Sequence, residues 1–373
     1  MTAFAEIKLG DVLTLQRGFD ITKDEQTAGS VPIVSSSGVS SYHNQAKAIA
    51  PGVVIGREGT LGTVHFLNVP YWPHDTSLWI KDFKGNDARF IYFFLQTLKL
   101  QNFDVGASNP TLNRNHVHRI KVFFPTTVET QRNIAAILTA YDDLIEANQR
   151  RIALLERMAE EIYREWFVRL RFPGHEKTKL TKGVPAGWRN GRFGQFCRLK
   201  RGYDLPDAEI VAGPYPVIAS TSIKAFHAEF KVEPPVITTG RSGSLGEVLM
   251  VNQRAWPLNT ALYVKEFFGN SPFLIFYTLR NMDLENFNAG AGVPTLNRNH
   301  LEGLRLVIPP PSLQARFDEV VGPLHRQADA LRVANQILTR TRDALLPRLI
   351  SGKLRVDDLA IQFPPSMAAD AAG

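Results

Sequence analysis

The stretch Thr111-Leu112-Asn113-Arg114-Asn115-His116 occurs a second time in this chain, as Thr295-Leu296-Asn297-Arg298-Asn299-His300. Each copy follows a proline, Pro110 or Pro294, and the copies stand 184 residues apart. Six identical residues do not recur by chance in a chain of ordinary composition. The repeat therefore indicates an internal duplication.

Other segments align at the same displacement of 184 residues. They are Arg17-Gly18-Phe19-Asp20 with Arg201-Gly202-Tyr203-Asp204, Tyr42-His43 with Phe226-His227, Gly56–Gly62 with Gly240–Gly246, and Trp72-Pro73 with Trp256-Pro257. Because the displacement is constant, the loops between elements must have equal lengths in both copies. We therefore predict two copies of one domain.

Composition narrows the class of protein. A chain of 373 residues with 44% hydrophobic residues is expected to form two or three domains with filled cores. The one cysteine, Cys197, excludes an internal disulfide and is expected to pack in a core. No apolar run reaches bilayer length and no signal peptide begins the chain, which predicts a cytoplasmic protein. The net charge of +7 weakly favours an acidic partner such as nucleic acid.

Each repeat unit reads as mixed α/β structure. Short β-type runs at 12–15, 31–34, 53–55, 77–80 and 120–124 alternate with glycine and proline turns. Residues 87–101 predict the helix of the first unit, and residues 271–280 predict its counterpart. The last strand of the second unit is expected at 304–308.

A long helix is predicted after each unit. Apolar positions step by four and three from Ile134 to Trp166, and again from Phe317 to Leu349, as in a coiled-coil seam. Pro323 is expected to kink or interrupt the second helix. Asn148 and Asn335 fall on the two seams, where a polar residue fixes helix register. We predict antiparallel helices with Asn148 facing Asn335 and Trp166 near Phe317.

The predicted fold class is therefore α+β, with two tandem mixed α/β domains joined by two long helices in an antiparallel intramolecular coiled coil. The expected segments are a first domain at 1–127, a central helix at 128–170, a connector at 171–187, a second domain at 188–311, a distal helix at 312–352 and a disordered tail at 353–373.

A catalytic or metal constellation is not evident in the sequence. It has no Walker phosphate loop, no glycine-rich dinucleotide loop and no His-Glu-x-x-His motif. The repeated Gly-Arg-x-Gly turn lacks the lysine of a phosphate loop, so it is interpreted as a tight turn that presents Arg57 and Arg241. Asp20 and Asp204 are interpreted as turn caps. Two similar domains on a long helical spacer instead suit the reading of two sites on DNA.

Three helical signatures carry a family resemblance. Leu154–Phe167 with the following Arg171-Phe172-Pro173-Gly174-His175-Glu176 resembles the central region of type I restriction–modification specificity subunits. Pro185–Trp188 resembles the entry to their second target-recognition domain, and Arg342–Gly352 resembles their distal helix. The resemblance covers nearly the whole chain.

The resemblance implies a non-catalytic subunit that reads a bipartite DNA target, with one domain for each half-site. The coiled coil would set the spacing and dock two methyltransferase subunits, with restriction subunits as possible further partners. The chain would hold no cofactor or metal, and S-adenosylmethionine would belong to the methyltransferase. The chain indeed lacks the Asn-Pro-Pro-Tyr/Phe motif of adenine methyltransferases. The two domains align without a gap, which predicts related half-sites.

Candidate DNA contacts fall into two sets. Arginines shared by both copies are predicted phosphate contacts, with surface salt bridges as an equal alternative: Arg17, Arg57, Arg114, Arg201, Arg241 and Arg298. The shared His43 and His227 join the candidates, as do polar positions that differ between copies: Asn44, Gln45, Glu58, His74, Asp75, Glu229, Ser242 and Asn259. Drift of an unselected surface explains those differences about as well. Tyr163, Trp166 and Phe167 are the candidates for subunit docking.

Two other classes of function stay open. A stand-alone sequence-specific DNA-binding protein or coiled-coil scaffold is the main alternative. It has no evident need for the aromatic run at Trp166 and Phe167. An enzyme would have to methylate or cleave DNA without another subunit.

Overall fold

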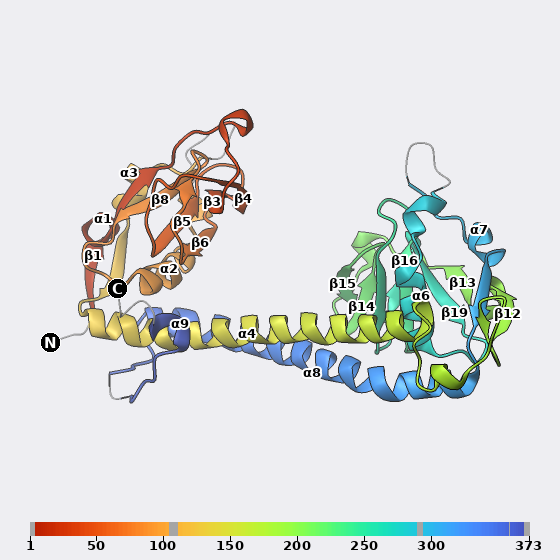
Figure 1. Ribbon diagram of the computed structural model, residues 1–373. Coiled ribbons are helices and arrows are strands. Elements are labelled where there is room, and N and C mark those ends of the chain that lie inside the picture. The colour runs from red at the N-terminus through yellow and green to blue at the C-terminus, as the bar shows by residue number, and fades with distance from the viewer. Residues whose placement is uncertain (1–3, 104–110, 289–293, 358, 369–373) are drawn as a thin grey trace. The chain divides into compact units, whose positions relative to one another are not determined.

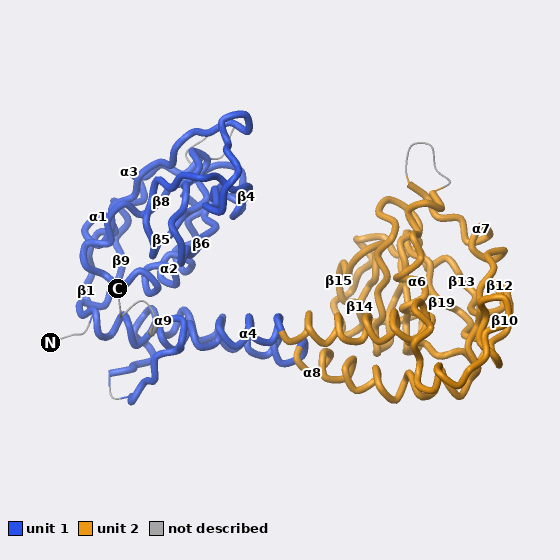
Figure 2. The backbone as a smooth tube through the Cα atoms, viewed as in Figure 1, with its two compact units in different colours: residues 1–150, 332–373 blue, residues 151–331 orange. Residues whose placement is uncertain are grey.

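The computed structural model describes residues 4–103, 111–288, 294–357 and 359–368. Pro110, which precedes the first copy of the repeated motif, lies outside them. The chain divides into two compact units, residues 1–150 with 332–373 and residues 151–331 (Figure 2). The division falls within the long helices rather than at the predicted boundaries near 127 and 188, so each unit holds one globular domain and part of both helices.

The first domain contains the five predicted strands within a few residues, as β2, β3, β5, β8 and β9, together with four strands that were not predicted (Figure 1). An antiparallel sheet has the order β2-β8-β5-β6, and a mixed sheet has the order β4-β3-β7. The strands are β1 (Phe4–Lys8), β2 (Thr14–Arg17), β3 (Val31–Ser35), β4 (Gly38–His43), β5 (Gly52–Gly56), β6 (Val64–Leu67), β7 (Trp72–Pro73), β8 (Ser77–Asp82) and β9 (Lys121–Pro125). The helices are α1 (Leu9–Val12), α2 (Ala88–Gln96) and α3 (Arg114–His118).

Helix α2 closes the core of the first domain. The Asp87 carboxylate caps it by accepting the Phe90 N–H, and Phe90 and Phe94 are buried against Phe124 of β9. The helix ends at Gln96, so the predicted extension to residue 101 is wrong. A separate 3-10 turn, Leu100–Phe103, follows.

The second domain repeats this architecture at the displacement of 184 residues. Its sheets have the orders β13-β19-β16-β17 and β15-β14-β18. The strands are β10 (Leu180–Thr181), β11 (Val184–Pro185), β12 (Arg189–Arg192), β13 (Arg198–Arg201), β14 (Tyr215–Ile218), β15 (Ile223–His227), β16 (Val236–Gly240), β17 (Val248–Val251), β18 (Trp256–Pro257), β19 (Ala261–Glu266) and β20 (Arg305–Ile308). The helices are α5 (Phe193–Phe196), α6 (Pro272–Asn281) and α7 (Arg298–Glu302). Cys197 is buried as predicted, and burial raises the pKa of its thiol to about 12.

The two long helices are α4 (Val128–Tyr163), extended by a π-helical turn at Arg164–Val168, and α8 (Pro311–Ile350). In unit 1 the start of α4 packs with the end of α8, as the Ile134, Leu138 and Leu349 cluster shows. In unit 2 the end of α4 packs with the start of α8 through Ala159 and Phe317. The helices are therefore antiparallel. Within the described part of the chain, no helix is long and apolar enough to cross a membrane.

Two predictions about α8 and the tail are wrong. Helix α8 is not interrupted at Pro323, because the buried Val321 and its neighbours hold it against the second domain. The described part of the tail, residues 353–357 and 359–368, is ordered, because Val356 and Met367 are buried in the core of unit 1 and a short helix, α9 (Pro365–Ala368), ends the described chain. Residues 358 and 369–373 lie outside the described residues. Arg89 also donates to the Ser366 carbonyl at 2.8 Å.

Candidate nucleic-acid interface

The segments that repeat in sequence are neighbours in the first domain. The Gly18 N–H donates to the Ser77 carbonyl at 3.0 Å. The Arg57 N–H donates to the Thr76 carbonyl at 3.0 Å, and the Leu112 N–H donates to the Arg57 carbonyl at 3.0 Å. Backbone hydrogen bonds thus join the ends of β2, β5 and β8 to the repeated motif at one place.

The second domain makes the same connections. The Gly202 N–H donates to the Ala261 carbonyl at 3.0 Å, and the Arg241 N–H donates to the Thr260 carbonyl at 2.8 Å. The Leu296 N–H donates to the Arg241 carbonyl at 2.8 Å. Identical main-chain geometry explains why these glycines and prolines recur with a constant displacement.

The repeated motif Thr111–His116 has a structural role. Leu112 is fully buried, and Leu296 in the second copy is 1% exposed. The Asn113 side chain caps α3 by accepting the Asn115 N–H at 2.9 Å, and Asn297 caps α7 in the same way. The motif fixes a loop to the Arg57 turn and begins a short helix, which accounts for its recurrence in both domains.

Two arginines in the first domain converge on one residue. Arg17 Nε donates to the Asp75 carbonyl at 3.4 Å, and Arg57 Nη1 donates to the same oxygen at 3.3 Å. Arg17 Nη2 also pairs with Asp75 Oδ2 at 2.9 Å, and Arg57 pairs with Glu58. Five of the predicted contacts, including the neighbouring His74, are therefore brought together here. We call Arg17 and Arg57 the arginine clamp.

The second domain has the corresponding arginine clamp, Arg201 and Arg241. Arg201 Nε and Arg241 Nη1 each donate to the Asn259 carbonyl at 3.3 Å. Ser242 follows Arg241, and its carbonyl accepts the Ser220 hydroxyl at 2.8 Å. Both clamps hold the same main-chain carbonyl, so they are a feature of the fold whichever side chain stands at position 75 or 259.

The side chains around the two clamps carry different charge. The first domain places Glu58 and Asp75 where the second has Ser242 and Asn259. These two replacements make the first site more negative by two charges. His74 is likewise replaced, by the buried Leu258. One scaffold thus presents hydrogen-bond acceptors in one domain and amide or hydroxyl groups in the other, which can pair with different base edges.

His43 and His227 are buried within their own domains. They are 6% and 5% exposed, and each ring lies edge-on to a tryptophan, Trp72 or Trp256. His43 Nδ1 accepts the Thr27 N–H at 2.9 Å, and His227 Nδ1 accepts a main-chain N–H at 3.0 Å. Both rings are thus engaged inside their own domains, and their assignment to DNA stays a prediction.

The remaining candidates are exposed but lie on other segments. Asn44 and Gln45 follow β4, and Glu229 follows β15. Arg114 and Arg298 begin α3 and α7, and Arg298 donates to the Leu199 carbonyl at 3.4 Å. The contacts of the described residues do not join these five side chains to the clamps. Their assignment to DNA stays a prediction.

The two seam asparagines meet in unit 1. Asn148 Nδ2 donates to Asn335 Oδ1 at 2.8 Å, and Asn335 Nδ2 donates to the Ile145 carbonyl at 3.2 Å. Asn148 is 4% exposed, so its amide depends on this partner. The predicted contact between the two residues is present in the structure.

The aromatic residues proposed for docking pack within unit 2. Tyr163 is 7% exposed and stacks on Tyr277, with ring centroids 5.6 Å apart. Trp166 and Phe167 contact Phe317 at centroid distances of 5.8 and 5.0 Å, the first as predicted. All three side chains thus make contacts inside unit 2, and their assignment to subunit docking stays a prediction.

Comparison with known proteins shows which proteins this chain resembles. A model of the type I restriction modification DNA specificity domain matches residues 1–157. The chain is 24% identical over 307 residues to the type I restriction enzyme MjaIX specificity subunit of Methanocaldococcus jannaschii, a match over 74% of this chain and 71% of that protein. Residues 1–157 thus resemble a type I restriction–modification DNA specificity domain, and the chain as a whole is similar to a type I specificity subunit.

A solved structure shares the fold of this chain. It is the S subunit of a type I restriction–modification system from M. genitalium, with a TM-score of 0.63 over 93% of this chain and 96% of that one. Only 16% of residues are identical, so the likeness concerns the architecture. The expected architecture of two domains and paired long helices is confirmed.

The long helices α4 and α8 carry apolar side chains that lie outside the seam between them. In α4, Leu144 is 45% exposed, and Leu154 and Met158 are each 53% exposed. In α8, Val333 and Ile337 are 55% and 59% exposed. Residues four apart share one helix face, so Leu154 lies beside Met158 and Val333 lies beside Ile337. We call these exposed residues, Leu144, Leu154 and Met158 of α4 with Val333 and Ile337 of α8, the second apolar stripe. Their spacing is visible in the sequence, but they were not predicted, because the seam residues already explained the helical periodicity.

Proposed function

We propose that this chain is a specificity subunit that reads a split DNA target, one half-site by each domain, within a complex that contains two methyltransferase subunits. The observation that carries the proposal is the pair of arginine clamps. The same scaffold occurs twice, and side chains of different charge stand at the same place in each copy. A protein that recognises two half-sites needs this combination of a shared backbone structure and side-chain contacts that differ between the domains.

The clamps could bind DNA because each places arginine side chains, which can contact phosphates, beside polar side chains that differ between the two domains. Arg17 is 56% exposed at its side chain and can release Asp75 to meet a phosphate. Glu58 or Asp75 can accept from the amino group of cytosine or adenine, whereas Asn259 can donate and accept. The two half-sites therefore need not be identical, even though the domains align without a gap.

The second apolar stripe is the surface that we assign to the methyltransferase subunits. Exposed leucine, methionine, valine and isoleucine at helical spacing form the kind of patch that marks a protein interface. Leu154 and Met158 belong to unit 2, whereas Val333 and Ile337 belong to unit 1. One such face in each unit suits one methyltransferase subunit for each domain.

The chemistry would then reside in the partners. The methyltransferase subunits would bind S-adenosylmethionine, restriction subunits could join them, and the assembly would act in the cytoplasm. The helix pair would fix the spacer between the half-sites.

Co-purification tests this function. The chain is co-expressed with a type I methyltransferase subunit, and the complex is assayed on duplexes that contain one or both half-sites. We expect a stable complex whose affinity falls at least tenfold when either half-site is scrambled, since each mismatched pair costs about 1–3 kcal/mol. Tight, sequence-specific binding by the isolated chain, without complex formation, would instead favour the stand-alone regulator.

Variants in the stripe sharpen this test. Leu154→Asp and Ile337→Asp should weaken methyltransferase capture, because each places a charge in the apolar interface. The matched control is Gln149→Asp, which adds the same charge at an exposed polar position of α4. Equal capture by all three variants would remove the stripe from the proposal.

A further inference from the structure

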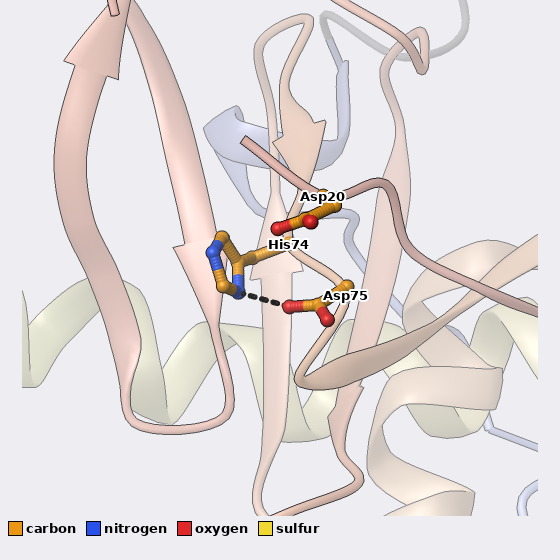
Figure 3. Close-up of side chains that lie close together, drawn as sticks. All are labelled: Asp20, His74 and Asp75. Atoms are coloured by element: carbon orange, nitrogen blue, oxygen red, sulfur yellow. Dashed lines mark ion pairs between the residues drawn. The ribbon is translucent and has the colours of Figure 1, made fainter. Parts of the chain in front are cut away.

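Three potential metal ligands lie together in the first domain. Asp20, His74 and Asp75 each offer one ligand atom, and these atoms lie within 4.8 Å of one another (Figure 3). Main-chain pairing of Phe19 with His74 brings the two segments together. His74 Nδ1 lies 2.9 Å from Asp75 Oδ1, and the Asp20 carboxylate faces the same space.

The second domain supplies an internal comparison. The corresponding residues are Asp204, Leu258 and Asn259. Asn259 Nδ2 donates to Asp204 Oδ1 at 2.6 Å, so an amide N–H satisfies the carboxylate there. In the first domain a second carboxylate replaces that amide, and an imidazole replaces the leucine. Both replacements supply metal ligands, and the facing carboxylates repel one another unless a proton or cation lies between them.

The arginine clamp engages one carboxylate oxygen of Asp75. Arg17 binds the main-chain carbonyl at position 75, as Arg201 does at the uncharged Asn259, so its presence does not depend on a carboxylate. Its ion pair uses Asp75 Oδ2. The other oxygen, Oδ1, points towards His74.

We propose that Asp20, His74 and Asp75 bind one divalent transition-metal ion, with Zn²⁺ as the representative. One imidazole nitrogen and two carboxylate oxygens form a ligand set that Zn²⁺ and Mn²⁺ accept, whereas Mg²⁺ and Ca²⁺ prefer oxygen ligands throughout. The His74 and Asp75 side chains are 23% and 21% exposed, and Asp20 is exposed. Solvent can therefore reach the ion and complete its coordination.

The ion would join two segments of the first domain. Asp20 follows β2, whereas His74 and Asp75 lie between β7 and β8. Binding requires His74 Nδ1 to give up its contact with Thr76 Oγ1, which lies 3.0 Å away. Because the folded domain gathers the ligands, the metal binds the native state preferentially and raises its melting temperature.

Isothermal titration of the metal-stripped full-length chain with ZnCl₂ tests the site without DNA, so its outcome is independent of the proposed function. We expect one binding equivalent that disappears in His74→Leu and in Asp75→Asn. Both substitutions install the residue of the second domain, which preserves the local fold. Each should weaken binding by more than the roughly 10–100-fold that changes to outer-shell partners cause.

Two further variants complete the test. The double substitution Leu258→His/Asn259→Asp should create a second Zn²⁺ site, in the second domain, so that the chain binds two equivalents of Zn²⁺. The control variant His116→Gln, which removes an exposed histidine elsewhere, should still bind one equivalent. Identical Zn²⁺ titrations of the original chain and His74→Leu would overturn the proposal. The His74–Asp75 contact would then be a hydrogen bond of the imidazole N–H. Circular dichroism checks that each variant is folded, and the two single variants must agree.

Discussion

Removing the amide of Asn148 should loosen the helix pair locally in unit 1. Asn148 is 4% exposed and donates to Asn335 Oδ1 at 2.8 Å. Asn148→Ala deletes a hydrogen bond that contributes about 1 kcal/mol and leaves the Asn335 carbonyl without this donor, at a further cost of about 1 kcal/mol. The total of about 2 kcal/mol corresponds to a roughly 30-fold shift in the local opening equilibrium.

Hydrogen exchange of α4 and α8 measures this opening without assuming two-state unfolding of a two-unit chain. Amides around Asn148 and Asn335 should exchange roughly 30-fold faster in Asn148→Ala. The matched control is Gln149→Ala, an exposed neighbour that should change the opening free energy by less than about 0.5 kcal/mol.

The single substitutions Asn148→Leu and Asn335→Leu form a double-mutant cycle with their combination, Asn148→Leu/Asn335→Leu. Leucine at both positions removes the unpaired amide, so protection should return to at least the original level. Equal exchange in Asn148→Ala and Gln149→Ala would refute the account of this pair, as would additive losses in the double variant.

Three further predictions concern single features. Leu112→Ala leaves a cavity and should destabilise unit 1 by about 2–5 kcal/mol, and Leu296→Ala should destabilise unit 2 by the same amount. In limited proteolysis, each variant should therefore be cleaved faster in its own unit. Equally fast cleavage of both units in either variant would contradict this. Deleting residues 353–373 removes the buried Val356 and Met367, so limited proteolysis should cleave unit 1 faster while the cleavage rate of unit 2 stays the same. An unchanged cleavage rate in unit 1 would show that the tail does not stabilise it. Burial, together with Arg114 and Lys84, lowers the pKa of His118 below 6.5, and its ring accepts the Leu15 N–H at 2.9 Å. Its stabilising contribution is thus present above pH 6.5 and lost as pH falls through the folded-state pKa, and His118→Gln should reduce the acid sensitivity of the urea midpoint.

Features set by periodicity could be predicted from the sequence. The constant displacement of the repeat predicted matching elements, and α2 and α6 begin 184 residues apart. The heptad seam predicted antiparallel helices with Asn148 facing Asn335, because buried polar side chains need partners.

Features that depend on tertiary contacts could not be predicted in this way. His43 has the sequence context of a surface histidine, and only its packing on Trp72 shows that it is buried. The tail looked disordered because isolated apolar residues such as Met367 show no period. Pro323 looked like an interruption because local backbone rules do not include the packing of Val321.

The convergence of the clamp residues was also beyond the sequence. Arg17, Arg57 and Asp75 come from three separated segments, and only the sheet brings them together. The duplication nevertheless marked these positions as places where residues shared by both copies stand beside residues that differ.

Methylome sequencing of cells that carry the complex tests the central claim most directly. It should be run with the original chain and with Glu58→Ser/Asp75→Asn, which gives the first clamp the side chains of the second. The account predicts a split motif with a fixed spacer, in which the substitutions alter one half and leave the other unchanged. An unsplit motif, or a change in both halves, would contradict the assignment of one half-site to each domain.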